Sequence, residues 1–255
     1  EIVFLNAISF FVCYNPKKGG KAMEKYVGII AAMPEEMEAI KNKMVNVKEV
    51  DIFNLKFFEG KIQNQKIVLV KCGVGKVNAA RTTQIMIDKF DISYIINIGS
   101  AGSINDEIDY GDIVIGKYVL QHDFDITAFG HEKGYISNIG VKLESNSKLI
   151  KRCEYVIKNM KENLYKCVIG TIATGDIFCT SRKMKEKIRT KFDADCVEME
   201  GAAIAQTAYL SDTPFIIIRS ISDSPNENNQ IDFNKYLKMA ANRCAIFIEN
   251  LMKAN

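Results

Sequence analysis

Short apolar runs alternate with amphipathic segments along the chain from Tyr26 onward. Apolar runs bounded by turn residues are typical of buried strands, whereas apolar positions repeating every three or four residues are typical of helices. The predicted strands are 26–32, 47–62 with an interruption near residue 54, 66–72, 94–98, 112–120, 166–173, 194–197 and 214–220. The predicted helices are 35–44, 77–90, 148–160, 181–191, 201–210 and 233–252. This alternation indicates an α/β fold with a mostly parallel sheet that is flanked by helices on both faces.

Residues 1–22 do not fit this pattern. The segment 2–14 is almost continuously apolar, but it is too short to span a bilayer. Basic residues follow this apolar segment instead of preceding it, which argues against a signal peptide. We interpret 1–22 as a non-native or upstream-translated extension, because Lys17-Lys18-Gly19-Gly20 permits codons that resemble a ribosome-binding site before Met23. No linker divides 23–255, so we expect one domain there.

Composition narrows the class of protein. The chain has 255 residues, of which 47% are hydrophobic and 25% charged, as is ordinary for a folded domain. Its 34 basic and 31 acidic residues are dispersed, so we expect neither a nucleic-acid nor a membrane partner. The seven cysteines have no C-x-x-C spacing, which favours reduced thiols and a cytoplasmic location. With only two histidines as well, no metal site is expected.

Two glutamates, Glu198 and Glu200, lie where the predicted strand 194–197 runs into the helix 201–210. On a strand, residues two apart share one face, so both carboxylates would point the same way. The carboxyl ends of strands are where α/β sheets build ligand sites. Taken alone, the segment fits a site for hydroxyl groups and a solvated turn equally well.

Further carboxylates occur at similar strand-to-helix boundaries. Glu36 begins the helix after the first strand, and Asp223 follows strand 214–220 with Arg219 at its end. By itself, Asp223 before Ser224-Pro225 is more typical of a turn. Together, three carboxylates at one edge of a sheet, without a histidine or a nucleophile elbow, favour acid/base hydrolysis of an acetal-like bond.

The segment Gly73-Val74-Gly75-Lys76 follows a strand and precedes a helix, so its backbone amides could meet an anion. The third glycine of a dinucleotide fingerprint is missing, which favours a tight turn or the wall of another pocket. The loop 121–146, rich in aromatic and polar residues, is expected to be a lid or a partner contact.

Six motifs in this order resemble the bacterial 5′-methylthioadenosine/S-adenosylhomocysteine nucleosidases, from about Tyr26 to the C-terminus. They are Gly28 to Glu36, Gly73 to Lys76, Asn97 to Gly102, Ala173 to Asp176, Val197 to Glu200 and Arg219 to Asp223. The resemblance implies a nucleoside phosphorylase-like fold with a central mixed sheet, a homodimer, no cofactor, and hydrolysis of the adenine-to-ribose bond in methionine salvage.

The resemblance also implies residue roles. Asp223 would donate a proton to adenine N7, with its pKa raised by burial so that it holds that proton near neutrality. Glu36 would activate the attacking water, supported by Ser100 and Arg219. Glu200 would accept hydrogen bonds from the ribose hydroxyls.

Other positions would form the walls of the pocket. Met199 would lie beside the ribose; Phe178, Cys179 and Ser222 would contact adenine; and Met33, Val74 and Phe233 would line the thioalkyl pocket, with Phe129 contributed by the other subunit. His131 is expected at the mouth of the thioalkyl site, and neither histidine is assigned a catalytic role.

Three alternatives stay open from the sequence. Phosphorylases of this fold place an arginine three residues before the serine of the G-S motif, where this chain has Asn97. Glu36 would also repel phosphate, so hydrolysis is favoured over phosphorolysis. Hydrolases of aminofutalosine are harder to separate. A non-catalytic nucleoside-binding module is least favoured, because binding alone does not require all three acids.

Overall fold

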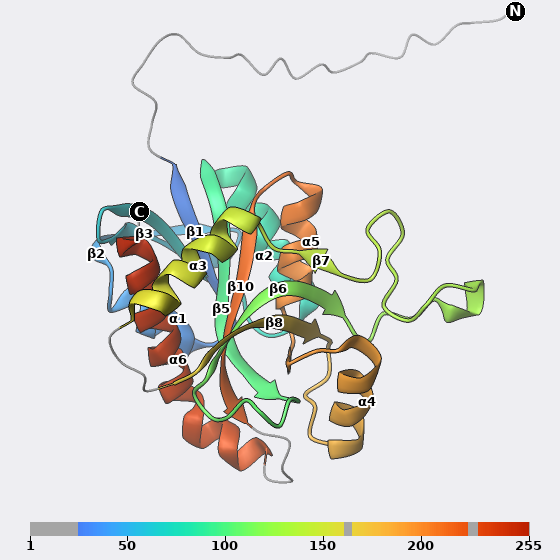
Figure 1. Cartoon of the computed structure of the whole chain (residues 1–255). Coiled ribbons are helices and arrows are strands. Elements are labelled where there is room, and N and C mark those ends of the chain that lie inside the picture. The colour runs from blue at the N-terminus through green and yellow to red at the C-terminus, as the bar shows by residue number, and fades with distance from the viewer. Residues whose placement is uncertain (1–24, 161–164, 224–228, 255) are drawn as a thin grey trace, which may run out of the picture.

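One sheet with helices on both faces organises the computed structural model, which describes residues 25–160, 165–223 and 229–254 (Figure 1). The predicted extension 1–22 lies outside the described residues. The strands are β1 (Tyr26–Ala31), β2 (Val45–Ile52), β3 (Leu55–Ile62), β4 (Gln65–Lys71), β5 (Ile92–Ser103), β6 (Ile113–Gln121), β7 (Leu143–Glu144), β8 (Cys167–Thr174), β9 (Cys196–Glu198) and β10 (Phe215–Asp223). The helices are α1 (Pro34–Lys41), α2 (Lys76–Lys89), α3 (Ser147–Asn159), α4 (Arg182–Phe192), α5 (Gly201–Leu210) and α6 (Asn229–Lys253), with a 3-10 turn η1 (Thr127–Phe129).

The sheet is mixed and partly closed. Strands β4, β1, β5 and β10 run parallel to one another, as do β6, β8 and β9. The two blocks join through the antiparallel pairs β10–β6 and β5–β9, which close a ring of five strands. The hairpin of β2 and β3 extends the sheet beyond β4. Because the first block is parallel, its carboxyl ends meet at one edge.

The helices divide into two layers. Helices α1, α3 and α6 cover one face, whereas α2 and α5 pack together on the other (Figure 1). Local sequence explains where two of these helices begin. Pro34 is the first residue of α1, where a backbone N–H would have no partner within the helix, so its absence in proline costs nothing. At the start of α3, the Asn146 side chain accepts hydrogen bonds from the amides of Lys148 and Leu149. Both layers therefore bury their apolar stripes against the sheet.

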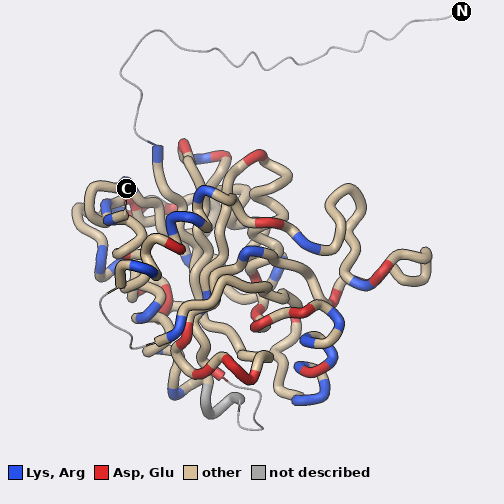
Figure 2. Tube along the Cα trace, in the orientation of Figure 1, with Lys and Arg blue, Asp and Glu red and all other residues tan. Residues whose placement is uncertain are grey.

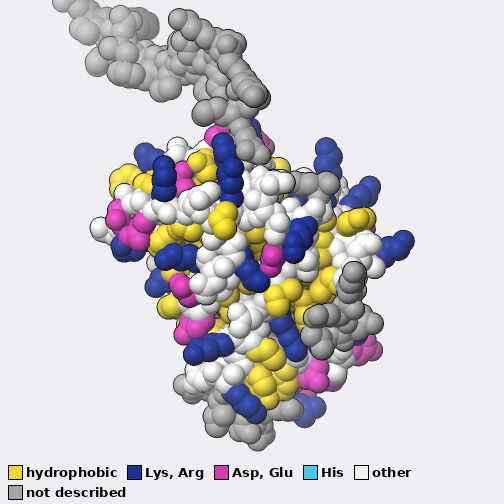
Figure 3. Space-filling model, turned by 90° about the vertical axis from the view of Figure 1, so that its left-hand side faces the viewer, with side chains coloured by type: hydrophobic (Ala, Val, Ile, Leu, Met, Phe, Trp, Pro, Cys, Tyr) yellow, Lys and Arg dark blue, Asp and Glu magenta, His cyan; other side chains and the backbone are white. Residues whose placement is uncertain are grey.

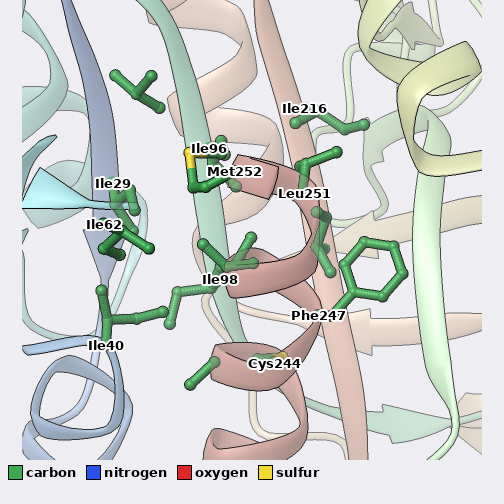
Figure 4. Packing of buried hydrophobic residues seen from close by; sticks show 14 of the residues in the cluster. Ile29, Ile40, Ile62, Ile96, Ile98, Ile216, Cys244, Phe247, Leu251 and Met252 are labelled. Atoms are coloured by element: carbon green, nitrogen blue, oxygen red, sulfur yellow. The ribbon is translucent and has the colours of Figure 1, made fainter. Parts of the chain in front are cut away.

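Figure 4 shows the core between the sheet and α6. Ile29 of β1, Ile96 and Ile98 of β5 and Ile216 of β10 are fully buried, and they face Leu251 among other α6 side chains. These strands are buried on both faces, which explains their unbroken apolar runs. A rigid core thus lies directly behind the edge where the parallel strands end.

The surface matches the dispersed charge of the sequence. Acidic and basic residues are dispersed over the described trace in Figure 2, and the face in Figure 3 shows both signs among hydrophobic side chains. Within the described ranges, no helix combines the length and apolarity needed to cross a membrane. The six cysteines of those ranges are free thiols.

Two predicted strands were too short. Strand β5 continues through the Gly-Ser-Ala-Gly segment to Ser103, and β10 continues to Asp223. The prediction that Glu198 and Glu200 share a strand face was wrong, since β9 ends at Glu198 and Glu200 is the N-cap of α5.

Candidate active site

A cavity of about 420 Å³ opens at the carboxyl ends of β1, β5 and β10. This volume lies in the range of small-molecule sites. Most predicted site residues line it, namely Met33, Glu36, Val74, Ser100, Phe178, Cys179, Met199, Glu200, Arg219, Ser222, Asp223 and Phe233. Residues from separate parts of the chain thus meet where the parallel strands β1, β5 and β10 end and where the closed ring of strands brings the segments after β8 and β9 to the same edge.

Glu36 is fixed at the start of α1. Its Oε2 accepts from the backbone amides of Ala32 and Met33, both at 3.0 Å. Its Oε1 accepts from the amide and hydroxyl of Ser100, at 2.9 and 3.0 Å. These contacts hold a buried carboxylate at the cavity wall, and the Ser100 contacts tie α1 to β5. Four donors on two oxygens therefore fix the orientation of this side chain.

Arg219 is the centre of a buried charge cluster. Its Nη2 donates to Asn97 Oδ1 at 2.6 Å and to Glu198, and lies 3.5 Å from Glu200 Oε2. Its Nη1 makes a longer contact of 3.4 Å with the Ser100 carbonyl. Arg219 therefore connects the two glutamates to the strand that carries Ser100.

Glu198 stabilises the local backbone. Its Oε2 accepts from the amides of Glu200 and Gly201, at 2.9 and 2.7 Å, where α5 begins. A carboxylate there satisfies free amides and interacts favourably with the helix dipole. Its Oε1 accepts from the Thr174 hydroxyl. Glu198 thus positions Glu200 through both the helix start and Arg219.

Glu200 lines the cavity and has a raised pKa. Burial raises its pKa from 4.5 to about 7, and the nearby charge of Glu198 also raises it, whereas Arg219 and the Gly75 amide lower it. The Gly75 amide donates to Oε1 at 2.9 Å. Gly73 and Gly75 have φ of +84° and +98°, so the segment is a tight turn. The anions that meet its amides are protein carboxylates, Glu200 at Gly75 and Asp176 at Lys76, the latter at 2.8 Å.

The two glycines of the Gly-Ser-Ala-Gly segment make room for charged side chains. In the sheet register, Arg219 lies beside Gly99 and Asp223 beside Gly102. A Cβ at Gly99 would lie 2.1 Å from Arg219 Nη1, and one at Gly102 would lie 2.6 Å from Asp223 Oδ2. Both positions therefore require glycine because a charged side chain of β10 passes close to the backbone, and not because the chain turns there.

Asp223 forms a buried ion pair that the sequence analysis missed. Lys185 Nζ of α4 lies 3.1 Å from Asp223 Oδ2, with side-chain exposures of 1% and 3%. The Ser222 hydroxyl makes a longer contact of 3.3 Å with Oδ1. The ammonium adds a positive charge beside a carboxyl group for which only burial had been considered.

Aromatic side chains form the opposite wall. Phe178 and Phe233 meet edge to face, with ring centroids 5.7 Å apart. Phe178 is 42% exposed, so a ring face remains for stacking by a planar base. Phe129, in η1, is 81% exposed and lies outside the lining of its own chain's cavity. His131 stacks on Tyr135 and likewise does not line this cavity.

Buried charge is concentrated at this site. In the described ranges, the buried side chains of Asp, Glu, Lys and Arg are Glu36, Lys185, Glu198, Glu200, Arg219 and Asp223. Charged groups are rarely buried without partners, because desolvation is costly. Three acidic side chains, Glu36, Glu200 and Asp223, thus surround a cavity that is otherwise lined mainly by apolar side chains. This arrangement suits acid/base chemistry on a small molecule that has both polar groups and a flat ring.

Comparison with known proteins gives consistent results. The family model of the phosphorylase superfamily matches residues 26–253. The 5′-methylthioadenosine/S-adenosylhomocysteine nucleosidase of Staphylococcus haemolyticus is 40% identical over 228 residues, which are 89% of this chain and 99% of that protein.

Solved structures of similar proteins cover the same region. The Neisseria meningitidis nucleosidase of that name, in complex with methylthio-immucillin-A, has a TM-score of 0.87 and 37% identity, covering 91% of this chain and all (100%) of that one. The futalosine hydrolase of Helicobacter pylori has a TM-score of 0.86 and 30% identity, covering 91% and 99%.

Proposed function

This chain belongs to the phosphorylase superfamily and, within it, to the 5′-methylthioadenosine/S-adenosylhomocysteine nucleosidases, and we propose that it hydrolyses the N-glycosidic bond of both nucleosides. The products are adenine and the 5-thioribose. The charge of the residues that line the cavity favours water over phosphate as the attacking group. The charged lining residues are Glu36, Glu198, Glu200, Asp223 and Arg219. Four acids against one base, itself paired with glutamates, disfavour a phosphate dianion.

The first step is departure of the base. Asp223 donates its proton to adenine N7 while the bond between the sugar and adenine breaks, so that the leaving base carries no full negative charge. The Phe178 ring stacks on the adenine, and the Cys179 backbone and Ser222 contact the edge of the base. A proton supplied in the transition state typically accelerates such a step by about 10²- to 10⁴-fold.

The second contribution is water attack. Glu36 accepts a proton from the water that adds to the oxocarbenium-like sugar carbon, and Ser100 holds Glu36 in position. Arg219 supports this side of the site, since it lines the cavity and its buried Nε has no hydrogen-bond partner within the described structure. The Glu200 carboxylate accepts from the ribose hydroxyls beside Met199, an interaction that strengthens as the ring flattens.

We also propose a cytoplasmic homodimer that acts in methionine salvage. The exposed Phe129 and Val77, at 81% and 79%, support a partner surface on η1 and α2. Phe129 then completes the thioalkyl pocket of the neighbouring subunit, next to Met33, Val74 and Phe233. Light scattering tests the dimer. A Phe129→Ala variant is expected to keep the dimer mass and to raise the KM for methylthioadenosine.

A second candidate activity is hydrolysis of aminofutalosine, favoured by the 30% identity to the Helicobacter pylori futalosine hydrolase. One assay separates the candidates. The protein is incubated with methylthioadenosine, S-adenosylhomocysteine, aminofutalosine and inosine, with and without phosphate, and the released base is measured. We expect phosphate-independent adenine release from the first two. Turnover that requires phosphate, or that occurs only with aminofutalosine, would contradict the proposal.

A further inference from the structure

Lys185 occupies a position on α4 where an apolar residue is expected. It lies on the same buried stripe as Ile188 and Phe192, at a spacing of three and then four residues. Its neighbours Lys183 and Lys187 are exposed. A helix normally turns such a stripe toward the core and its lysines toward water. Burial of this one ammonium is costly unless its charge is used.

The partner of Lys185 identifies that use. Its Nζ contacts Asp223 Oδ2 at 3.1 Å, and both side chains are almost fully buried. Asp223 lines the cavity, whereas Lys185 lies behind it, outside the lining. The ammonium is therefore placed to act on a bound nucleoside through the carboxyl group of Asp223.

We propose that Lys185 is a positioning residue that sets the acid strength of Asp223 for departure of the base, an inference that rests on the proposed nucleosidase activity. Lys185 holds Oδ2, and Oδ1 delivers the proton. As the Oδ1–H bond breaks, the N7–H bond forms, and the electrons of the C–N bond pass to adenine. Asp223 becomes a carboxylate, which the ammonium stabilises without losing a proton of its own. After the products leave, Glu36 releases to solvent the proton that it took from the attacking water, and Asp223 takes up a proton from solvent.

The physical need for the ammonium follows from burial. Burial keeps a carboxyl group protonated, but it also makes that group a reluctant donor, because the carboxylate formed is poorly solvated. An opposite charge nearby lowers the pKa by about 1 to 3 units and brings the acid toward the operating pH. Lys185 thus offsets the desolvation that would otherwise make Asp223 too weak an acid.

The other side chains that the structure describes around Asp223 are either neutral or already paired. Cys179 precedes α4 and Cys196 lies on β9; burial raises the pKa of Cys179 to about 11 and that of Cys196 well above its usual value, so both remain neutral thiols. Arg219, on β10 itself, is paired with Glu198 and Glu200. The described lining residues of α6, Phe233 and Asn234, carry no charge.

The test compares Lys185→Met and Lys185→Gln, which remove the charge, with Lys185→Arg, which keeps it. The exposed Lys187→Met is the matched control. The full chain is assayed with methylthioadenosine from about pH 5 to pH 10, after wild-type adenine release has been established. We expect at least tenfold lower kcat in the Met and Gln variants. In a plot of kcat against pH, the decline of activity at high pH, called the high-pH limb, is expected to shift to a higher pH by about one unit or more in these variants, because Asp223 then holds its proton more tightly. The Arg variant is expected to keep the wild-type limb.

A second substrate separates this role from a structural one. A 5-methylthioriboside with 4-nitrophenolate as leaving group needs no proton from Asp223. We expect the Met and Gln variants to retain its turnover within about twofold. Equal losses on both substrates with an unmoved pH limb would overturn the proposal, as would a limb that moves equally in Lys187→Met. Failure of the wild-type chain to release adenine would instead refute the proposed function. If Lys185→Met does not fold, the Gln variant, which keeps a hydrogen-bond donor, decides the outcome.

Discussion

Replacing Glu200 with Gln is expected to stabilise the folded protein at alkaline pH while it removes most of the activity. The substitution keeps the size of the side chain and an acceptor for the Gly75 amide, which donates to Oε1 at 2.9 Å. It removes the charge that burial disfavours. Glu198 remains as the ion-pair partner of Arg219, so no buried cation is left alone.

The magnitude follows from the pKa of Glu200, which burial raises from 4.5 to about 7. A raised pKa means that the folded state binds the proton more tightly than the unfolded state does. Its stabilising contribution is therefore complete below pH 4.5 and is lost as the pH rises to 7. The difference of about 2.5 units corresponds to about 3 kcal/mol at most, of which about 2 kcal/mol or more is lost between pH 5 and pH 8.

The assay is urea unfolding of wild type and Glu200→Gln at pH 5 and at pH 8. The two proteins are expected to have similar stability at pH 5, since Gln resembles the protonated Glu. At pH 8 the variant is expected to be more stable by about 2 to 3 kcal/mol. For a chain of this size, that gain corresponds to a midpoint roughly 5 to 10 °C higher in a thermal melt.

Comparing the two proteins at each pH cancels the titration of every other group. The exposed Glu38 provides the matched control, because Glu38→Gln should give the same difference from wild type at both pH values. The quantity of interest is the unfolding free energy of Glu200→Gln minus that of wild type. If this difference is no larger at pH 8 than at pH 5, the argument that burial raises the pKa of this carboxyl group is refuted.

Three further outcomes test the site. Glu36→Gln is expected to lower kcat by about 10²-fold or more, as measured by adenine release, and also to lower the melting temperature, because the amide nitrogen of Gln cannot accept from the two donors that now meet one carboxylate oxygen. Gly102→Ala is expected to lower kcat at least tenfold because its Cβ would lie 2.6 Å from Asp223 Oδ2. The control Gly28→Ala on β1, whose Cβ would lie 2.4 Å from the Met86 sulfur and otherwise near Ile92 and Ile95, should lower stability and leave kcat unchanged. Phe178→Ala is expected to raise the KM about tenfold with a smaller change in kcat, because stacking of a base on an aromatic ring contributes about 1 to 3 kcal/mol.

Most elements and the mixed α/β class could be predicted from local sequence. The unbroken apolar run of β1 and the turn signal between β2 and β3 depend on neighbouring residues alone. The length of β5 was underestimated because glycines usually mark a turn. In this chain, Gly99 and Gly102 extend a strand, since two charged side chains of β10 pass over them. Such a reason arises only from the register of two strands far apart in the sequence.

The candidate site shows the same division. Glu200 follows β9, which runs antiparallel to β5, so its place in the cavity depends on closure of the ring of strands. Glu36 and Asp223 could be placed together because β1 and β10 belong to one parallel block whose strands end at one edge. Lys185 could not, because it lies within a helix that is otherwise rich in exposed lysines. Its pairing with Asp223 depends on where α4 lies relative to the end of β10, which local periodicity does not specify. A lysine on the apolar stripe was the one signal available in the sequence.

The protonation states of Glu200, Glu36 and Asp223 are linked through substrate binding and the chemical step. Burial raises the pKa of Glu200 to about 7, so this side chain titrates near neutrality in the free protein. Ribose hydroxyls that donate to Glu200 favour its ionised form, so nucleoside binding lowers this pKa and releases a proton. Below pH 7 the same linkage weakens binding, because the proton must leave before the hydroxyls can donate. Glu36 then gains a proton from water as Asp223 loses one to adenine, and the total negative charge of the closed site stays constant through the chemical step.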